Sequence, residues 1–113
     1  MMLKAYKDNR LILEEVENAN NFFSRFMGLM YRKSMARNHG LLLTPCNEIH
    51  TFGMKFDIDT VTMDKGNVIL LIDDAVPPNK VRKKVKNGYK VLELNSGVAA
   101  ELGLEIGDTI EFK

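Results

Sequence analysis

The stretch from Asn47 to Asp59 constrains the fold more than any other, because its residues alternate at the strand period of two. Its even positions from His50 onward carry a histidine and apolar side chains, and the residues between them are polar or glycine. After Asp59 the pattern slips, and the apolar residues Val61 and Met63 occupy odd positions. A slip of one residue turns every following side chain to the opposite face of a strand. The sequence therefore predicts that the backbone bends, bulges or changes sheet near residues 57–59.

The remainder of the chain consists largely of short strand patterns separated by turn residues. The pair Asp8-Asn9 favours a turn, and Pro77 and Pro78 end a strand because neither offers a backbone N–H. This spacing of short strands predicts a mainly β, β-rich α+β fold, a small antiparallel sandwich or partly open barrel. The predicted strands are 3–6, 11–16, 40–44, 47–59, 60–64, 68–72, 89–94 and 109–112.

Two helices are expected beside these strands. The first is an amphipathic helix near the N-terminus, where apolar residues recur at spacings of three and four over about three turns. We interpret its apolar stripe as core packing. The second is a short helix over 97–102, capped by Ser96 and ended by Gly103 in the left-handed conformation. The stripe of the first helix comprises Phe22, Phe23, Phe26, Met27, Met30 and Tyr31.

Composition is typical of a folded globular protein and favours a single domain over residues 1–113. The chain is 45% hydrophobic and 27% charged, and its net charge of +1 gives no general attraction to nucleic acid or anionic membrane. No stretch has the length of a signal peptide core or a membrane span. One cysteine excludes an internal disulfide and suits a reducing compartment. We therefore expect a soluble protein with a cytoplasmic location.

Cys46 and His50 stand close together in the sequence, with carboxylates at Asp57 and Asp59. A thiol, an imidazole and a carboxylate can form a nucleophilic site or bind zinc. However, a spacing of four in an extended segment does not bring two side chains together, and His39 is eleven residues from His50. No Cys-x-x-Cys or His-Glu-x-x-His motif occurs. We therefore expect no metal and no cofactor, and interpret Cys46 as a small, mostly buried apolar residue.

Four polar residues are the candidates for a ligand-binding site at the expected bend: His50, Thr51, Asp59 and Arg25. If they converge on the edge of an apolar cavity, they meet the usual description of a ligand site, and Arg25 could hold an anion through its planar guanidinium. Structural roles are open for two of them. His50 could be a hydrogen-bonded core histidine, and Asp59 could accept backbone N–H bonds that an irregular strand leaves without partners.

A basic run, Lys80 to Lys86, places five positive charges in seven residues. Such a run could contact phosphates with salt-dependent affinity. No aromatic residue interrupts it to stack on bases, and the whole-chain charge is nearly balanced. We therefore interpret the run as a solvated loop and do not expect a nucleic-acid partner.

Several motifs together resemble the bacterial and archaeal family catalogued as domain of unknown function 192. They are the residues 25–30 with Arg32, Ile49 to Met54, Phe56 with Asp59, the hairpin that follows, Val91 to Leu94 with Gly97, and Gly107-Asp108. One position departs from the family pattern, which has proline where this chain has Asp57. The resemblance implies a small β-rich fold with a helix packed on it and implies no known activity.

The function of the chain is not apparent from these features. The leading hypothesis is a binding module that holds a small ligand or a partner chain beside the bend. An enzyme with His50 as general base and Asp59 orienting it is the first alternative. A nucleic-acid-associated protein that uses the run Lys80 to Lys86 is the second.

Overall fold

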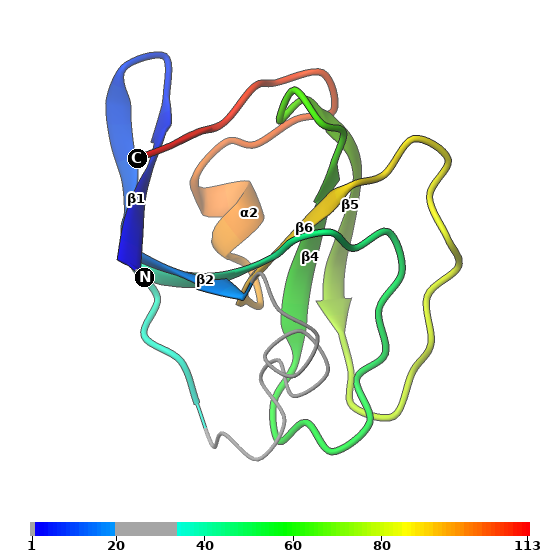
Figure 1. Cartoon of the computed structure of the whole chain (residues 1–113). Coiled ribbons are helices and arrows are strands. Elements are labelled where there is room, and N and C mark those ends of the chain that lie inside the picture. Colours follow the sequence, from blue (N-terminus) through cyan, green and yellow to red (C-terminus); the bar gives the residue numbers. More distant parts are fainter. Residues whose placement is uncertain (1, 20–33) are drawn as a thin grey trace.

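The computed structural model describes residues 2–19 and 34–113, and these residues form one sheet that curls into a half-barrel (Figure 1). The fold is therefore mainly β, as predicted. The amphipathic helix expected between Phe22 and Tyr31 lies outside the described residues. Within the described part the strands are β1 (Met2–Lys7), β2 (Arg10–Ala19), β3 (His39–Leu43), β4 (Ile58–Met63), β5 (Ile69–Val76), β6 (Lys90–Asn95) and β7 (Glu111–Phe112), with one helix, α2 (Val98–Glu101).

The sheet order, counted over the described strands, is β5-β4-β6-β3-β2-β1-β7. All neighbouring pairs with a described register are antiparallel except β2 and β3, which are parallel. The two ends of the sheet meet at one point, where Val68 and Thr109 form a bridge and the Ile69 N–H donates to Asp108 O at 2.8 Å. This contact closes one end of the half-barrel.

The β1–β2 hairpin has the turn that its sequence predicts. Asp8 and Asn9 both have positive φ, at 52° and 64°. A two-residue hairpin loop of type I′ needs this conformation at both central positions, and asparagine and aspartate tolerate it better than most residues. Strand β5 likewise ends at Val76, directly before Pro77.

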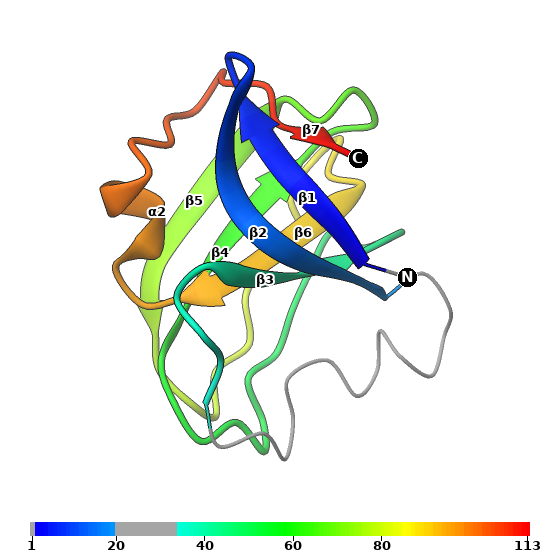
Figure 2. The same ribbon diagram turned by 90° about the vertical axis from the view of Figure 1, so that its left-hand side faces the viewer.

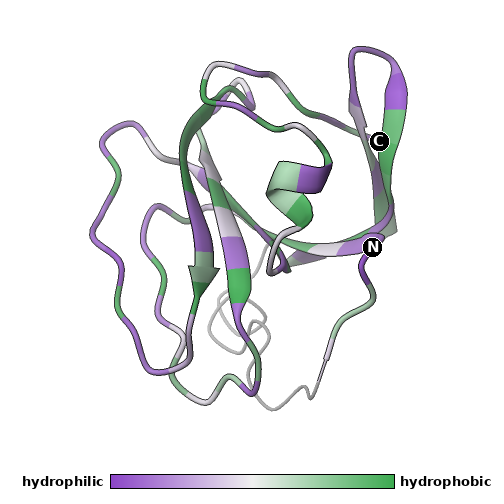
Figure 3. Ribbon diagram, turned by 180° about the vertical axis from the view of Figure 1, so that it is seen from behind, coloured by the Kyte–Doolittle hydropathy of each residue, from purple (hydrophilic) through white to green (hydrophobic). Residues whose placement is uncertain are grey.

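Two apolar clusters lie on the two faces of the sheet. The concave face holds the larger one, which joins Val61 and Met63 of β4 to Val98 and Ala99 of α2. On the convex face Ile58 packs with residues of the 44–57 connection and of β3 and β6. Helix α2 packs against β4 and β6, on the side toward which the sheet curls (Figure 1 and Figure 2), and Figure 3 shows hydrophobic residues on the strands and on α2.

The prediction of a strand over residues 47–59 is wrong for its first eleven positions, because regular pairing begins only at Ile58. A turn interrupts the alternating pattern: Gly53 has a φ of 78°, and the Met54 N–H donates to Thr51 O at 3.2 Å. Glycine adopts this left-handed conformation without steric cost. The isolated glycine within an alternating pattern was the available signal.

The predicted short C-terminal helix is present as α2, but its expected cap is not. Gly97, with a φ of 89°, occupies the N-cap position in place of Ser96, and glycine has no side chain that could cap the helix. Gly103 follows the helix in the left-handed conformation, at a φ of 68°, as predicted. An N–H of the first turn is instead satisfied from a neighbouring strand, as described below.

Candidate functional site

Asp59 is fully buried, and both of its carboxylate oxygens accept backbone N–H bonds. Oδ1 accepts from Ala75 of β5 at 2.9 Å, and Oδ2 accepts from Ala99 of α2 at 3.0 Å. Ala75 lies in a β-bulge with a φ of 50°, where Asp74 and Ala75 together oppose Asp59. A bulge leaves a ladder N–H without a strand partner, and the carboxylate replaces that partner. The bulge is on β5, whereas β4 pairs with β6 in continuous register from Ile58 to Met63. The prediction of a bulge within the strand near residues 57–59 is therefore wrong for β4.

Asp59 and His50 lie on different sides of the sheet. Asp59 has the same parity on β4 as Val61, and it bonds to α2 on the concave face. The connection that carries His50 packs on the convex face through Ile49. No hydrogen bond or ion pair joins Asp59 to His50 among the described residues. The arrangement fits the structural alternative for Asp59, and the orienting contact that a His50 general base would need is not formed by this carboxylate.

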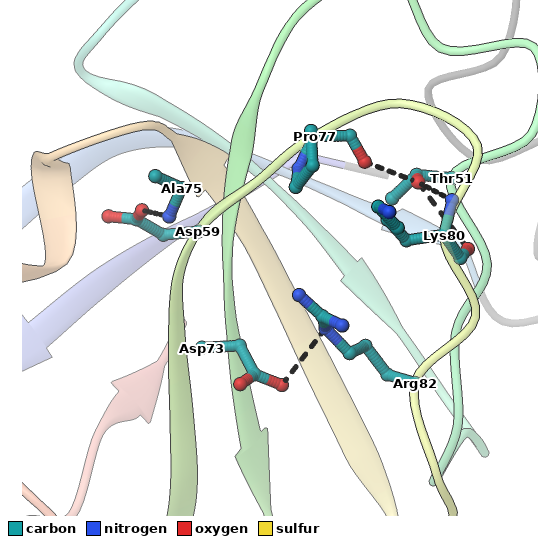
Figure 4. Close-up of polar contacts among 7 residues, drawn as sticks. All are labelled: Thr51, Asp59, Asp73, Ala75, Pro77, Lys80 and Arg82. Atoms are coloured by element: carbon teal, nitrogen blue, oxygen red, sulfur yellow. Dashed lines mark hydrogen bonds and ion pairs between the residues drawn. The ribbon is translucent and has the colours of Figure 1, made fainter.

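Thr51 is 1% exposed and fixes the loop after β5. Its hydroxyl donates to Pro77 O at 2.7 Å and accepts from the Lys80 N–H at 2.8 Å. Its backbone adds two more bonds, because the Thr51 N–H donates to Lys80 O at 2.8 Å and Thr51 O accepts from the Asn79 N–H at 3.0 Å. Figure 4 shows this group at a distance from the Asp59–Ala75 bond, with strand ribbon between them.

His50 is exposed and stacks on the ring of Phe52, with ring centroids 5.3 Å apart and planes inclined by 28°. Phe52 stands at the tip of the turn closed by Thr51 and Met54 and is 47% exposed. His50 also forms an antiparallel bridge with Val81, which is 62% exposed. Large apolar side chains that gather at the surface mark interaction sites more often than single ones do.

The basic loop is bonded along its length to the same connection. The Arg82 N–H donates to Ile49 O, and the Val85 N–H donates to Asn47 O, each at 2.9 Å. With the Thr51–Lys80 bonds, these contacts make an irregular two-stranded ribbon of residues 47–51 and 80–85. The exposed side chains of the ribbon and of the residues next to it include the acidic Glu48 and a set that we call the aromatic–basic surface: His50, Phe52, Lys80, Val81, Lys83, Lys84 and Lys86.

Arg82 differs from the neighbouring lysines because it points toward the sheet. Its Nε lies 3.8 Å from Asp73 Oδ2 (Figure 4), whereas none of the four lysines of the surface forms an ion pair within the described ranges. The recess beside Arg82 includes the buried Thr60 and Thr62 and has a volume of only about 10 Å³. That is room for one water molecule and far below the several hundred Å³ of a small-molecule pocket.

A larger hollow of about 370 Å³ lies between the turn after β4 and the loop before β6, lined by Asp64, Lys65 and Tyr89 among others. Its groups are already engaged, since Asp64 Oδ1 accepts from the Gly66 and Val68 N–H groups and Lys65 lies over the Tyr89 ring. Of the sequence-predicted site residues that the structure describes, none lines it.

Cys46 and His39 have separate surroundings. Cys46 is half-buried against the convex cluster, and its thiol donates to Glu48 O at 3.0 Å. His39 Nε2 lies 3.1 Å from Glu15 Oε2. In the part of the chain that the structure describes, no three His, Cys, Asp or Glu side chains are grouped as metal ligands. Nor do the described residues include a helix long and apolar enough to cross a membrane.

Over residues 2–19 and 34–113, the shifted pKa values occur at two surface ion pairs away from the ribbon. The hydrogen bond from Lys7 lowers the pKa of Asp108, with a further bond from the Glu105 N–H, and raises that of Lys7. The Arg37 guanidinium lowers the pKa of Glu101 in the same way. Both pairs join segments that are distant in sequence.

Sequence reasoning missed Phe52 and Val81 as surface residues, because it placed Phe52 on a buried strand face. It also counted the basic run as lacking an aromatic neighbour. The aromatic neighbours come from a segment about thirty residues earlier in the chain, through the His50–Val81 bridge. Arg25, the fourth predicted site residue, lies outside the described residues, and its role stays a prediction.

Two solved structures have the same fold. A crystal structure of a protein of unknown function from Novosphingobium aromaticivorans matches with a TM-score of 0.85 and 20% identity, over 98% of this chain and 84% of that chain. A protein from Sinorhizobium meliloti, described as a proposed transcription regulator, matches with a TM-score of 0.84 and 26% identity, over 98% of this chain and 92% of that chain.

Sequence comparison gives the same family that the motifs suggest. No curated protein matches the chain. The profile of family DUF192, described as "Uncharacterized ACR, COG1430", matches residues 4–112. The chain therefore belongs to this uncharacterised family.

Proposed function

We propose that this chain is a cytoplasmic, single-domain binding module that holds an anionic partner at the aromatic–basic surface. The observation that carries the proposal is the exposed His50–Phe52 stack, which backbone bonds attach to a loop with four exposed lysines. Cations and aromatic faces on one surface can bind a partner that carries both charge and planar groups.

The surface is prepared for binding because its backbone is already fixed. Thr51 ties the start of the basic loop to the turn of Phe52 by four hydrogen bonds of 3.0 Å or less. Ordering a flexible loop on binding would cost conformational entropy, and a loop that is already held avoids that cost.

This proposal changes the roles first expected of the candidate residues. His50 remains a proposed contact. Thr51 becomes a positioning residue, since its hydroxyl is occupied by Pro77 and Lys80. Asp59 becomes a brace between β5 and α2, since both of its oxygens are occupied.

The description of the Sinorhizobium meliloti protein as a proposed transcription regulator is that protein's own. A transcription regulator binds DNA or a partner protein, and DNA is anionic, so that description is compatible with an anionic partner. The support for the present proposal comes from the charges and rings of this chain.

A heparin column tests the proposal. Changing Lys83, Lys84 and Lys86 together to glutamine should move elution to lower salt, because these side chains supply the local positive charge. The matched control changes Lys4, Arg10 and Lys113, which are exposed on β1, β2 and the C-terminus, and removes the same charge. Equal elution of the two variants would show that net charge, and not this surface, determines retention, and the proposal would then be wrong.

A further inference from the structure

We infer that the anionic partner is a single-stranded nucleic acid. The inference rests on the proposed function and adds the chemical class of the partner. Such a strand presents phosphates at regular intervals together with flat base faces, and the aromatic–basic surface offers groups for both.

Phe52 and His50 provide the base-binding part. Their rings are inclined by 28° and are both exposed, so an unpaired base can extend the stack. Val81, which is 62% exposed and bridged to His50, adds apolar area beside them. Aromatic stacking accepts any base, because every base has a π-face.

The phosphate-binding part is the group of exposed lysines in the loop that contains Val81. Lys80 is bonded through its backbone to Thr51, which stands between His50 and Phe52, and Lys83, Lys84 and Lys86 follow in the same loop. Arg82 is excluded from this group because it turns toward Asp73. Positive charge beside a stacking platform is the usual arrangement for binding a single strand.

A duplex fits this surface poorly. Reading the major groove requires an exposed helix, or a two-stranded ribbon that projects far enough to enter the groove. The ribbon of residues 47–51 and 80–85 is held against the convex face of the sheet through the buried Ile49. The helix among the described residues, α2, has four residues, and its Val98 and Ala99 are buried against the sheet. A ring at the tip of a turn, as Phe52 is, can reach a base only where the base is not already stacked and paired.

The first experiment measures binding of a fluorescein-labelled oligothymidylate of about 15 nucleotides by anisotropy, a length within the range bound by small β domains. Phe52→Ala should weaken binding about 10-fold, as loss of one stacking contact does. Leu11→Ala, at another exposed apolar position, is the matched control and should change nothing. Changing Lys83, Lys84 and Lys86 to glutamine should flatten the dependence of log affinity on log salt by about 2, since each phosphate contact adds roughly 0.7 for a single strand.

A second experiment detects stacking directly. The chain contains no tryptophan, so Phe52→Trp introduces a single indole at the platform. Stacking of thymine on the indole should quench its fluorescence. The Phe52→Trp variant should still bind the oligonucleotide. Leu11→Trp carries the same reporter away from the surface and should not respond.

The outcomes separate this inference from the proposed function. Binding of both heparin and the oligonucleotide, with loss of only the latter in Phe52→Ala, supports both. Heparin binding that depends on the three lysines, with oligonucleotide binding that is absent or insensitive to Phe52→Ala, keeps the proposed function and overturns the inference. Equal affinity for a duplex of the same length, or binding to phosphatidylserine vesicles but not to the oligonucleotide, also overturns it.

Discussion

Asp59 supplies hydrogen-bond acceptors to two elements that are distant in sequence, 16 residues away at Ala75 and 40 residues away at Ala99. Neither N–H has a partner of the ordinary kind. Ala75 lies in a bulge, and Ala99 belongs to a helix whose capping residue is a glycine. A buried carboxylate accepting two N–H bonds is well satisfied, and so are the two donors.

At this scale we predict that Asp59→Ala destabilises the fold by about 3 kcal/mol, because the buried N–H of Ala99 and the partly buried N–H of Ala75 lose their acceptor. Urea unfolding followed by circular dichroism measures the change. Asp57→Ala, at an exposed neighbouring carboxylate, should leave the free energy of unfolding within about 0.5 kcal/mol of the parent value. If Asp59→Ala instead weakened ligand binding in a fully stable domain, the carboxylate would be a ligand contact, as the sequence first suggested.

At the scale of elements, the ribbon of residues 47–51 and 80–85 has strand-like bonds without a regular strand on either side. One side chain holds its two segments together at this end, because the Thr51 hydroxyl donates to Pro77 O and accepts from the Lys80 N–H. Proline cannot contribute an N–H to such a ribbon, and the carbonyl of Pro77 is the group that remains available.

We therefore expect Thr51→Val, which keeps the side-chain shape, to loosen this loop by about 1–2 kcal/mol through loss of the hydroxyl bonds. Hydrogen exchange should show faster exchange of the Lys80 amide, while amides of β4 and β6 keep their protection. Thr109→Val is the matched control at an exposed threonine. Unchanged exchange at Lys80 would mean that the backbone bonds alone hold the loop.

At the scale of the whole molecule, an ion pair helps to hold the C-terminal segment against the first hairpin. Lys7 Nζ lies 2.9 Å from Asp108 Oδ2 and also donates to Gly103 O at 2.9 Å. Asp108 is the residue whose carbonyl bonds to β5 where the half-barrel closes. The pair therefore connects the closing contact to β1.

This pair predicts a pH dependence. The lowered pKa of Asp108 means that its contribution to stability is complete above its ordinary value of 3.8 and is lost as the pH falls through the lower folded value. The raised pKa of Lys7 keeps the pair complete up to its ordinary value of 10.5. The difference in unfolding free energy between the parent and Asp108→Asn should thus be constant from about pH 5 to 9 and shrink near pH 3. For the control Asp57→Asn, the difference in unfolding free energy from the parent should not show this decrease near pH 3.

Local signals predicted the parts of this fold that depend on local chemistry. The turn at Asp8-Asn9, the end of β5 before Pro77 and the left-handed Gly103 all follow from backbone preferences of single residues. Parallel pairing of β2 with β3 and closure at Val68 and Thr109 depend on contacts between distant segments, which no local pattern encodes.

The candidate site was harder to predict for the same reason. Alternation from His50 onward favoured a strand, and only Gly53 indicated a turn there. The bond between Thr51 and Pro77 spans 26 residues, so the sequence could not show that a basic run and an aromatic tip share one surface. It did offer backbone bonding beside a bulge as one of two roles for Asp59, and that is the contact Asp59 makes.

The bulge at Asp74 and Ala75 also affects how copies of this chain meet. Beyond its first residues β5 is the outermost strand of the described sheet, and such a margin is a template on which another polypeptide can add. Here the bulge turns the Ala75 N–H toward the Asp59 carboxylate. The charged residues Asp73 and Asp74 precede Ala75, and Pro77 comes directly after the strand. We therefore expect this edge to pair poorly with the sheet edge of a second molecule.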